Sequence, residues 1–145
     1  MTEPAFVYQT DVATTPERLW AALTTGDLTR QYWFDRRIES SWVEGEPVRF
    51  YDGASDVVTD SGTVLEAVPH RTLSYSFRQE LGGDDPGPVT RVTFTLTPLE
   101  DGRVRLLLVH DQLGAPEDVD AWRHGWNPIL TNLQDFVQRS GTSAV

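Results

Sequence analysis

His110 is the side chain in this sequence best suited to chemistry near neutral pH. It continues the alternation of Val104, Leu106 and Leu108, so on a strand its imidazole shares their apolar face. There it would serve as a polar anchor for a ligand in an otherwise apolar pocket. The competing interpretation is a structural histidine, hydrogen-bonded to the backbone or to a tyrosine. Its neighbour Asp111 has the opposite parity, so we do not expect it to orient the ring.

The other two histidines give no sign of a metal site. His70 lies in the turn Pro69-His70-Arg71, and His124 lies near the start of the last predicted helix, so we expect both to be solvated. No histidine pair has the spacing of metal ligands, and neither a calcium loop nor an HExxH motif is present. We therefore expect no metal and no cofactor.

The composition excludes several kinds of covalent catalysis. The chain has no cysteine, and all 12 of its basic residues are arginine. It therefore lacks a thiol nucleophile, a disulfide, a lysine Schiff base and a P-loop lysine. No serine stands in a Gly-x-Ser-x-Gly elbow, and the carboxylates of Asp11, Glu39 and Glu66 fall on polar or mixed faces. These features favour binding over hydrolysis, and we predict no catalytic residue.

Length and charge limit the classes of protein and partner. The 145 residues fit one domain, residues 1–145. The net charge of −10 argues against nucleic acids and anionic membranes as partners. The N-terminus lacks the pattern of a secretory signal, and no apolar stretch approaches the length of a membrane span. We therefore expect a cytoplasmic protein.

Aromatic residues make up 10% of the chain and supply candidates for a ligand-binding wall. For each of them, packing in a plain core is about as plausible as contact with a ligand. The tyrosine hydroxyls need partners when buried, so we expect Tyr32 and Tyr75 to join His110 in a polar cluster. The predicted ligand-binding residues lie on strand faces or on the stripe of the last helix: Tyr32, Trp42, Phe50, Tyr75, Phe77, Phe94, His110, Trp122, Trp126 and Leu130.

The N-terminal third should hold a strand and two short helices. Residues Phe6 to Val12 alternate like a half-buried strand. Thr14 or Thr15 can cap a helix that has Pro16 at or near its first position. A second short helix is predicted from Leu28 to Phe34.

The middle of the chain should form a series of strands. The segments Asp52 to Ser61 and Gly82 to Pro88 are predicted loops, and Asp101-Gly102 is a predicted hairpin turn. The strand segments are Arg36 to Ser41, Pro47 to Tyr51, Thr63 to Val68, Leu73 to Phe77, Val92 to Leu96 and Val104 to Leu108.

A long amphipathic helix closes the chain. From about Glu117 the helical period returns for roughly 20 residues, with Pro128 expected to kink the helix or delay its start. Strands joined by turns give an antiparallel sheet, and this helix must cover one face of it. The predicted architecture is α+β: a curved antiparallel sheet of about six to seven strands around a long C-terminal helix, with two short helices after the first strand.

Six segments in this order resemble one superfamily. They are Thr15 to Thr24, Leu28 to Trp33, Ser41 to Gly45, Val92 to Pro98, Val109 to Asp111 and Gly125-Trp126. On these segments the chain resembles the START-like, or SRPBCC, helix-grip superfamily. Within it, the chain is most similar to the branch of the C-terminal domain of the activator of heat-shock protein 90 ATPase.

The resemblance implies a deep cavity between the sheet and the long helix, often filled by a hydrophobic small molecule. It also implies a fold that commonly forms homodimers. We expect non-catalytic binding of a hydrophobic or aromatic molecule. One alternative is an enzyme similar to polyketide cyclases and aromatases, with His110 as base. Others are a co-factor of the heat-shock protein 90 ATPase and a regulatory or stress-response accessory protein.

Overall fold

The structure is a computed structural model that describes residues 5–80, 89–113 and 116–143. Seven strands and three helices lie in these ranges. In chain order they are β1 (Phe6–Val12), α1 (Pro16–Thr24), α2 (Gly26–Thr29), β2 (Arg36–Ser40), β3 (Pro47–Asp52), β4 (Val58–Val68), β5 (Thr72–Gln79), β6 (Thr90–Pro98), β7 (Val104–Asp111) and α3 (Pro116–Ser143). The predicted loop Gly82 to Pro88 lies outside the described residues.

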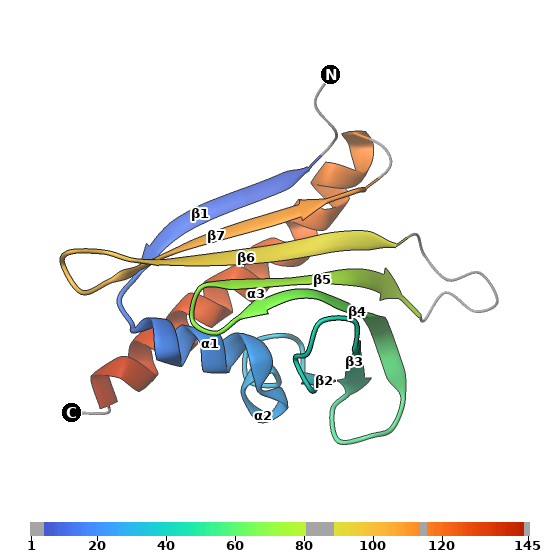
Figure 1. The fold of residues 1–145 in the computed structure, drawn as a ribbon, viewed down its shortest axis with the longest axis horizontal. Coiled ribbons are helices and arrows are strands. Elements are labelled where there is room, and N and C mark those ends of the chain that lie inside the picture. The colour runs from blue at the N-terminus through green and yellow to red at the C-terminus, as the bar shows by residue number, and fades with distance from the viewer. Residues whose placement is uncertain (1–4, 81–88, 114–115, 144–145) are drawn as a thin grey trace.

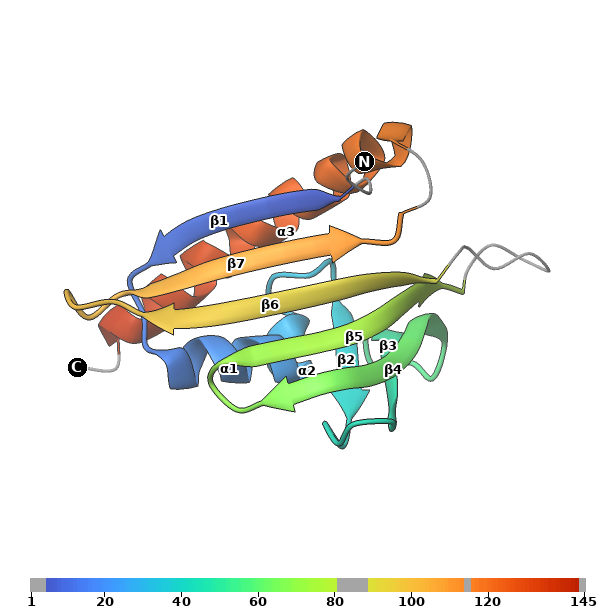
Figure 2. The same ribbon diagram turned by 45° about the horizontal axis from the view of Figure 1, so that its top comes forward.

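The strands form one antiparallel sheet in the order β1-β7-β6-β5-β4-β3-β2. The α3 helix runs along one face of this sheet, and α1 and α2 lie beside it (Figures 1 and 2). A single hydrophobic core joins the covered face of the sheet to α1 and α3. The predicted α+β helix-grip architecture is therefore confirmed.

The first helix begins where the sequence predicts. The Thr15 side chain accepts a hydrogen bond from the Arg18 N–H at 3.2 Å, and Pro16 opens the helix. The second helix differs from its prediction, because it spans Gly26–Thr29 instead of Leu28 to Phe34. The backbone φ angles of Phe34 and Asp35 are +48° and +59°, a left-handed conformation that cannot continue a right-handed helix.

The α2 helix covers the free edge of β2 and replaces a neighbouring strand. The Thr29 hydroxyl lies 2.8 Å from the carbonyl oxygen of Arg36 and accepts the N–H of Ile38 at 3.1 Å. A Cβ on Gly26 would stand 2.7 Å from the Ile38 carbonyl oxygen, so glycine permits this close approach. This edge is thereby closed to pairing with another strand at these residues.

The prediction of a loop from Asp52 to Ser61 is wrong, because β4 begins at Val58. The β-branched residues Val57, Val58 and Thr59 favour an extended conformation, and in the structure the strand continues from them through residues 60–62 into the expected segment. The longer strand brings Asp60 into the sheet opposite Gln79.

The last helix is longer than predicted, with 28 residues from Pro116 to Ser143. It includes Pro128 in its interior, so the predicted late start is wrong. Burial of an apolar stripe against the sheet offsets the hydrogen bond that proline cannot donate. The buried residues of this stripe are Trp126, Ile129, Leu130, Leu133 and Val137. None of the helices in the described ranges has the length and apolar character needed to span a bilayer.

Candidate functional site

His110 lies at the end of β7 and is completely buried. The Trp126 indole N–H donates to its Nδ1 at 2.9 Å, and its Nε2 lies 2.7 Å from the Thr90 hydroxyl oxygen. Because an indole can only donate, Nδ1 is the acceptor and Nε2 carries the proton. The Thr90 hydroxyl then accepts from Nε2 and donates to the carbonyl oxygen of Phe77 at 3.0 Å. Every polar atom of this chain of hydrogen bonds is paired.

These surroundings keep the imidazole neutral. Burial lowers the pKa of His110 to about 4, although the Asp111 carboxylate acts in the opposite direction. Asp111 itself pairs with Arg91, with the Arg91 Nε and Asp111 Oδ1 atoms 2.9 Å apart. The His110 ring lies 4.3 Å from the ring of Trp122 and 5.9 Å from that of Trp126, centroid to centroid. His110 therefore orients two tryptophans of α3, and neither of its nitrogens is available to a substrate.

Those tryptophans form part of a cavity of about 160 Å³ between one end of the sheet and α3. Most of its lining is aromatic or aliphatic, and three side chains from the sheet are polar. The lining residues are Trp33, Phe34, Arg36, Asp60, Phe77, Gln79, Trp122, Gly125, Trp126 and Ile129.

The apolar walls are held by ring contacts. The Trp33 and Trp126 ring centroids lie 5.1 Å apart, and those of Phe77 and Trp122 lie 5.8 Å apart with the rings nearly perpendicular. Two features mark the mouth of the cavity. Phe34 is 58% exposed, and a Cβ on Gly125 would meet no atom within 4 Å.

The polar wall consists of Arg36, Asp60 and Gln79. The Asp60 carboxylate accepts a hydrogen bond from the neighbouring Thr59 hydroxyl at 2.8 Å. Burial raises the pKa of Asp60, whereas the Thr59 hydrogen bond and the positive charge of Arg36 lower it. The Arg36 Nη1 atom lies 3.5 Å from Oδ1 of Asp52, a carboxylate at the surface. The wall therefore offers a cation from β2 and a half-buried anion from β4 to the same cavity.

Three of the predicted site residues, Phe77, Trp122 and Trp126, line this cavity. Six others lie in the packed core and are not part of its lining: Tyr32, Phe50, Tyr75, Phe94, His110 and Leu130. Their contact with a ligand stays a prediction.

The expected cluster of tyrosine hydroxyls with His110 does not form. The Tyr32 hydroxyl donates to the Ala22 carbonyl oxygen at 2.7 Å. The Tyr75 hydroxyl is buried and has no hydrogen-bond partner among the described residues. His110 instead takes its partners from β6 and α3.

Sequence reasoning missed the polar wall. Asp60 falls in the predicted loop Asp52 to Ser61, although the alternation from Val58 through Asp60 and Gly62 continues that of the strand. Arg36 shares the parity of buried Ile38, and this alternation could have placed it on the inner face. Gln79 could have been found in the same way from Phe77.

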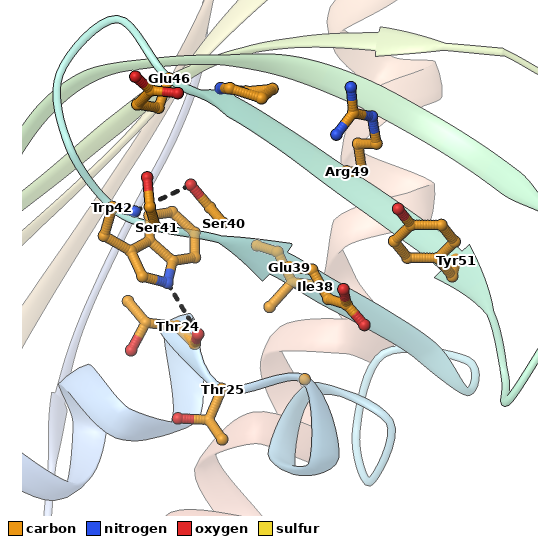
Figure 3. A pocket seen from close by; sticks show the side chains of 12 residues that line it. Thr24, Thr25, Ile38, Glu39, Ser40, Ser41, Trp42, Glu46, Arg49 and Tyr51 are labelled. Carbon is orange, nitrogen blue, oxygen red and sulfur yellow. Dashed lines mark hydrogen bonds between the residues drawn. The ribbon is translucent and has the colours of Figure 1, made fainter. Parts of the chain in front are cut away.

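A second, larger hollow of about 720 Å³ lies outside the sheet–helix interface (Figure 3). Trp42, the tenth predicted residue, is in its lining, where the indole N–H donates to the Thr24 carbonyl oxygen at 3.0 Å. Its carboxylates belong to Glu39 and Glu46, which are both exposed, and Glu39 pairs with Arg37 at 2.7 Å. We therefore regard the sheet–helix cavity as the candidate site.

Among the described residues, no three His, Cys, Asp or Glu side chains are grouped so as to hold a metal ion.

Comparisons with known proteins agree with this architecture. The family described as "Activator of Hsp90 ATPase homolog 1-like protein" matches residues 13–138. The structure of MLL2253 from Mesorhizobium loti is similar, with 25% identity, coverage of 93% of this chain and 97% of that chain, and a TM-score of 0.76.

Two further structures show the fold alone. The Aha1 dimer from Colwellia psychrerythraea has 20% identity, a TM-score of 0.72, and coverage of 95% of this chain and 97% of that chain. DynU16, from the dynemicin biosynthetic locus, has 17% identity and a TM-score of 0.74, and the match covers 97% of this chain but 49% of DynU16. Among curated proteins, none matches the sequence.

Proposed function

Since the chain belongs to the family of Activator of Hsp90 ATPase homolog 1-like proteins, we propose that it uses the helix-grip cavity to bind a hydrophobic or aromatic small molecule, without catalysis. The observation that carries the proposal is the aromatic lining of the cavity between the sheet and α3. A predominantly apolar pocket with a few convergent polar groups is the usual form of a small-molecule site.

The size of the cavity indicates the size of the ligand. An apolar cavity of about 150 Å³ holds a single benzene ring. The cavity of about 160 Å³ therefore fits one ring, and a second fused ring would extend between Phe34 and Gly125 at the mouth. Burial of each 100 Å² of ligand surface would contribute about 2.5 kcal/mol.

A titration with naphthalene tests the proposal, with the quenching of tryptophan fluorescence as the measure of binding. We expect the wild type to bind naphthalene and Gly125→Leu to bind it about tenfold more weakly, because the new side chain occupies the mouth. Thr131→Leu, at an exposed position of the same helix, is the control and should bind normally. Absence of binding by the wild type, or unchanged binding by Gly125→Leu, would overturn the proposal. Native mass spectrometry of the purified protein would identify any ligand that co-purifies.

The cyclase alternative assigns His110 as a general base, and its geometry does not favour that role. A base needs a free lone pair near its substrate, whereas Nδ1 of His110 accepts the Trp126 N–H inside the core. A pH–rate profile on aromatic polyketide or lactone substrates would reveal such an activity.

The co-factor role has the family description in its favour. It predicts that the protein accelerates ATP hydrolysis by heat-shock protein 90 at micromolar concentration, which a coupled ATPase assay measures.

We also infer one domain over residues 1–145, a cytoplasmic location and a homodimer. The dimer is supported by the Colwellia structure, and light scattering measures it directly.

A further inference from the structure

We propose that the ligand of this cavity is a planar aromatic molecule with a hydrogen-bond donor and an acceptor next to each other on one edge. The donor would bind Asp60 and the acceptor would bind Arg36. This inference rests on the proposed function and adds the chemical class of the ligand.

The Asp60 carboxylate is the group in the cavity wall that can accept a further hydrogen bond from a ligand. It is half-buried, and among the described residues its hydrogen bond comes from the Thr59 hydroxyl alone, at 2.8 Å to Oδ2. Its other oxygen therefore has acceptor capacity left. Burial raises the pKa of this carboxyl group, as expected for an anion that lacks enough donors.

Arg36 supplies the complementary half of the wall. Its guanidinium carries five N–H donors, and the contact with Asp52 at 3.5 Å engages one terminal nitrogen. The side chain is 29% exposed, so it lies at the border between the cavity and solvent. Arg36 and Asp60 both line this cavity of about 160 Å³, so a donor and an acceptor group face the same small space.

The apolar walls select a flat ligand. Trp33 comes from the segment between α2 and β2, Phe77 comes from β5, and Trp122 and Trp126 come from α3. Aromatic walls accept a planar molecule by stacking or edge contacts. A ring packed against them would turn one edge toward the polar wall, where a ligand without matching groups would displace water from Asp60 and Arg36 without replacing its hydrogen bonds.

A lactam fused to an aromatic ring is the simplest molecule with this edge. Isoquinolin-1(2H)-one has an N–H beside a carbonyl group, N-methylisoquinolinone lacks the donor, and naphthalene lacks both groups. We expect the wild type to bind isoquinolinone at least tenfold more tightly than N-methylisoquinolinone or naphthalene, as measured by calorimetry.

Asp60→Ala is the matching change in the protein. It should weaken isoquinolinone binding at least tenfold and leave naphthalene binding intact, which also reports that the cavity is folded. Glu66→Ala removes the same charge from an exposed position of β4 and should change neither the affinity for isoquinolinone nor the affinity for naphthalene.

The possible results separate the two proposals. Equal affinity of the wild type for isoquinolinone and naphthalene, or an Asp60→Ala protein that binds isoquinolinone normally, would overturn this inference and leave the proposed function standing. Failure of the wild type to bind any of the three probes would overturn both.

Discussion

The hydrogen bonds of His110 fix its tautomer and make its neutral form part of the core. In the unfolded chain the imidazole has its ordinary pKa of 6.5, whereas in the folded protein burial lowers this pKa to about 4. The unfolded state therefore binds more protons between these values, and the free energy of unfolding falls as the pH falls through this range.

Because of His110, we expect the free energy of unfolding of the wild type to fall by about 2 kcal/mol when the pH is lowered from 7 to 5. Urea denaturation at both pH values measures this loss, and His110→Asn should show a correspondingly smaller one. Asp60 contributes to this pH dependence with the opposite sign, because its raised pKa favours the folded state on acidification. Both proteins contain Asp60, so its contribution cancels in the comparison. An equal pH dependence of the two proteins would contradict the assignment.

The two buried tyrosines differ in their hydroxyl groups, and this difference is measurable. Tyr32 donates to the Ala22 carbonyl oxygen, so Tyr32→Phe should lose about 1 kcal/mol of stability. The unpartnered hydroxyl of Tyr75 gives no such contribution, so Tyr75→Phe should leave stability unchanged or raise it by about 1 kcal/mol. Thermal or urea unfolding of both variants provides the comparison. If Tyr75→Phe were as destabilising as Tyr32→Phe, a water or ligand atom would have to satisfy that hydroxyl.

At the scale of elements, the short α2 helix contributes more to the sheet than its length suggests. Its Thr29 side chain contacts both the carbonyl oxygen of Arg36 and the N–H of Ile38, on the side of β2 where no strand of the described ranges pairs. The position of Arg36 in the cavity wall therefore depends on α2.

Thr29→Val keeps the shape of the side chain and removes its hydrogen bonds. We expect a loss of about 1 to 3 kcal/mol in the free energy of unfolding, because two backbone groups of β2 lose their partner. Thr63→Val, at an exposed position of β4, should change stability by less than about 0.5 kcal/mol. Equal effects of the two changes would show that Thr29 does not hold the edge strand.

The elements that sequence predicted best were those with a clear period. The alternation from Val104 to His110 gave β7 and the inward direction of His110, and the Thr15-Pro16 pair gave the start of α1. The end of α2 was missed because it depends on left-handed conformations at Phe34 and Asp35. Those conformations are stabilised by distant contacts, such as the Gly53 N–H donating to the Asp35 carbonyl oxygen at 2.8 Å.

At the scale of the whole molecule, the resemblance to one superfamily identified the fold, and the apolar pattern identified the core. Neither could show which aromatic residues line the cavity, because most of the candidates share the buried inner side of the molecule. Phe50 and Phe77 both face inward from neighbouring parts of the sheet, yet Phe77 alone is in the lining. That distinction depends on how α3 lies across the sheet, which is a property of tertiary packing.

The excess of acidic residues has a local counterpart in the cavity. The chain has 22 acidic and 12 basic residues, so most arginines have carboxylates nearby. Arg36 lies between Asp52 at the surface and Asp60 inside, and the acidic surface therefore continues into the candidate site.

Gly125 links the stability of α3 to the width of the cavity mouth. A glycine within a helix costs about 1 kcal/mol relative to alanine, and here it leaves the mouth of the cavity open. Alanine or a longer unbranched residue at this position would strengthen α3 and narrow the mouth at the same time. Under the proposed function, position 125 therefore sets an upper limit on ligand size, and related chains with a larger residue there would take smaller ligands and be more stable.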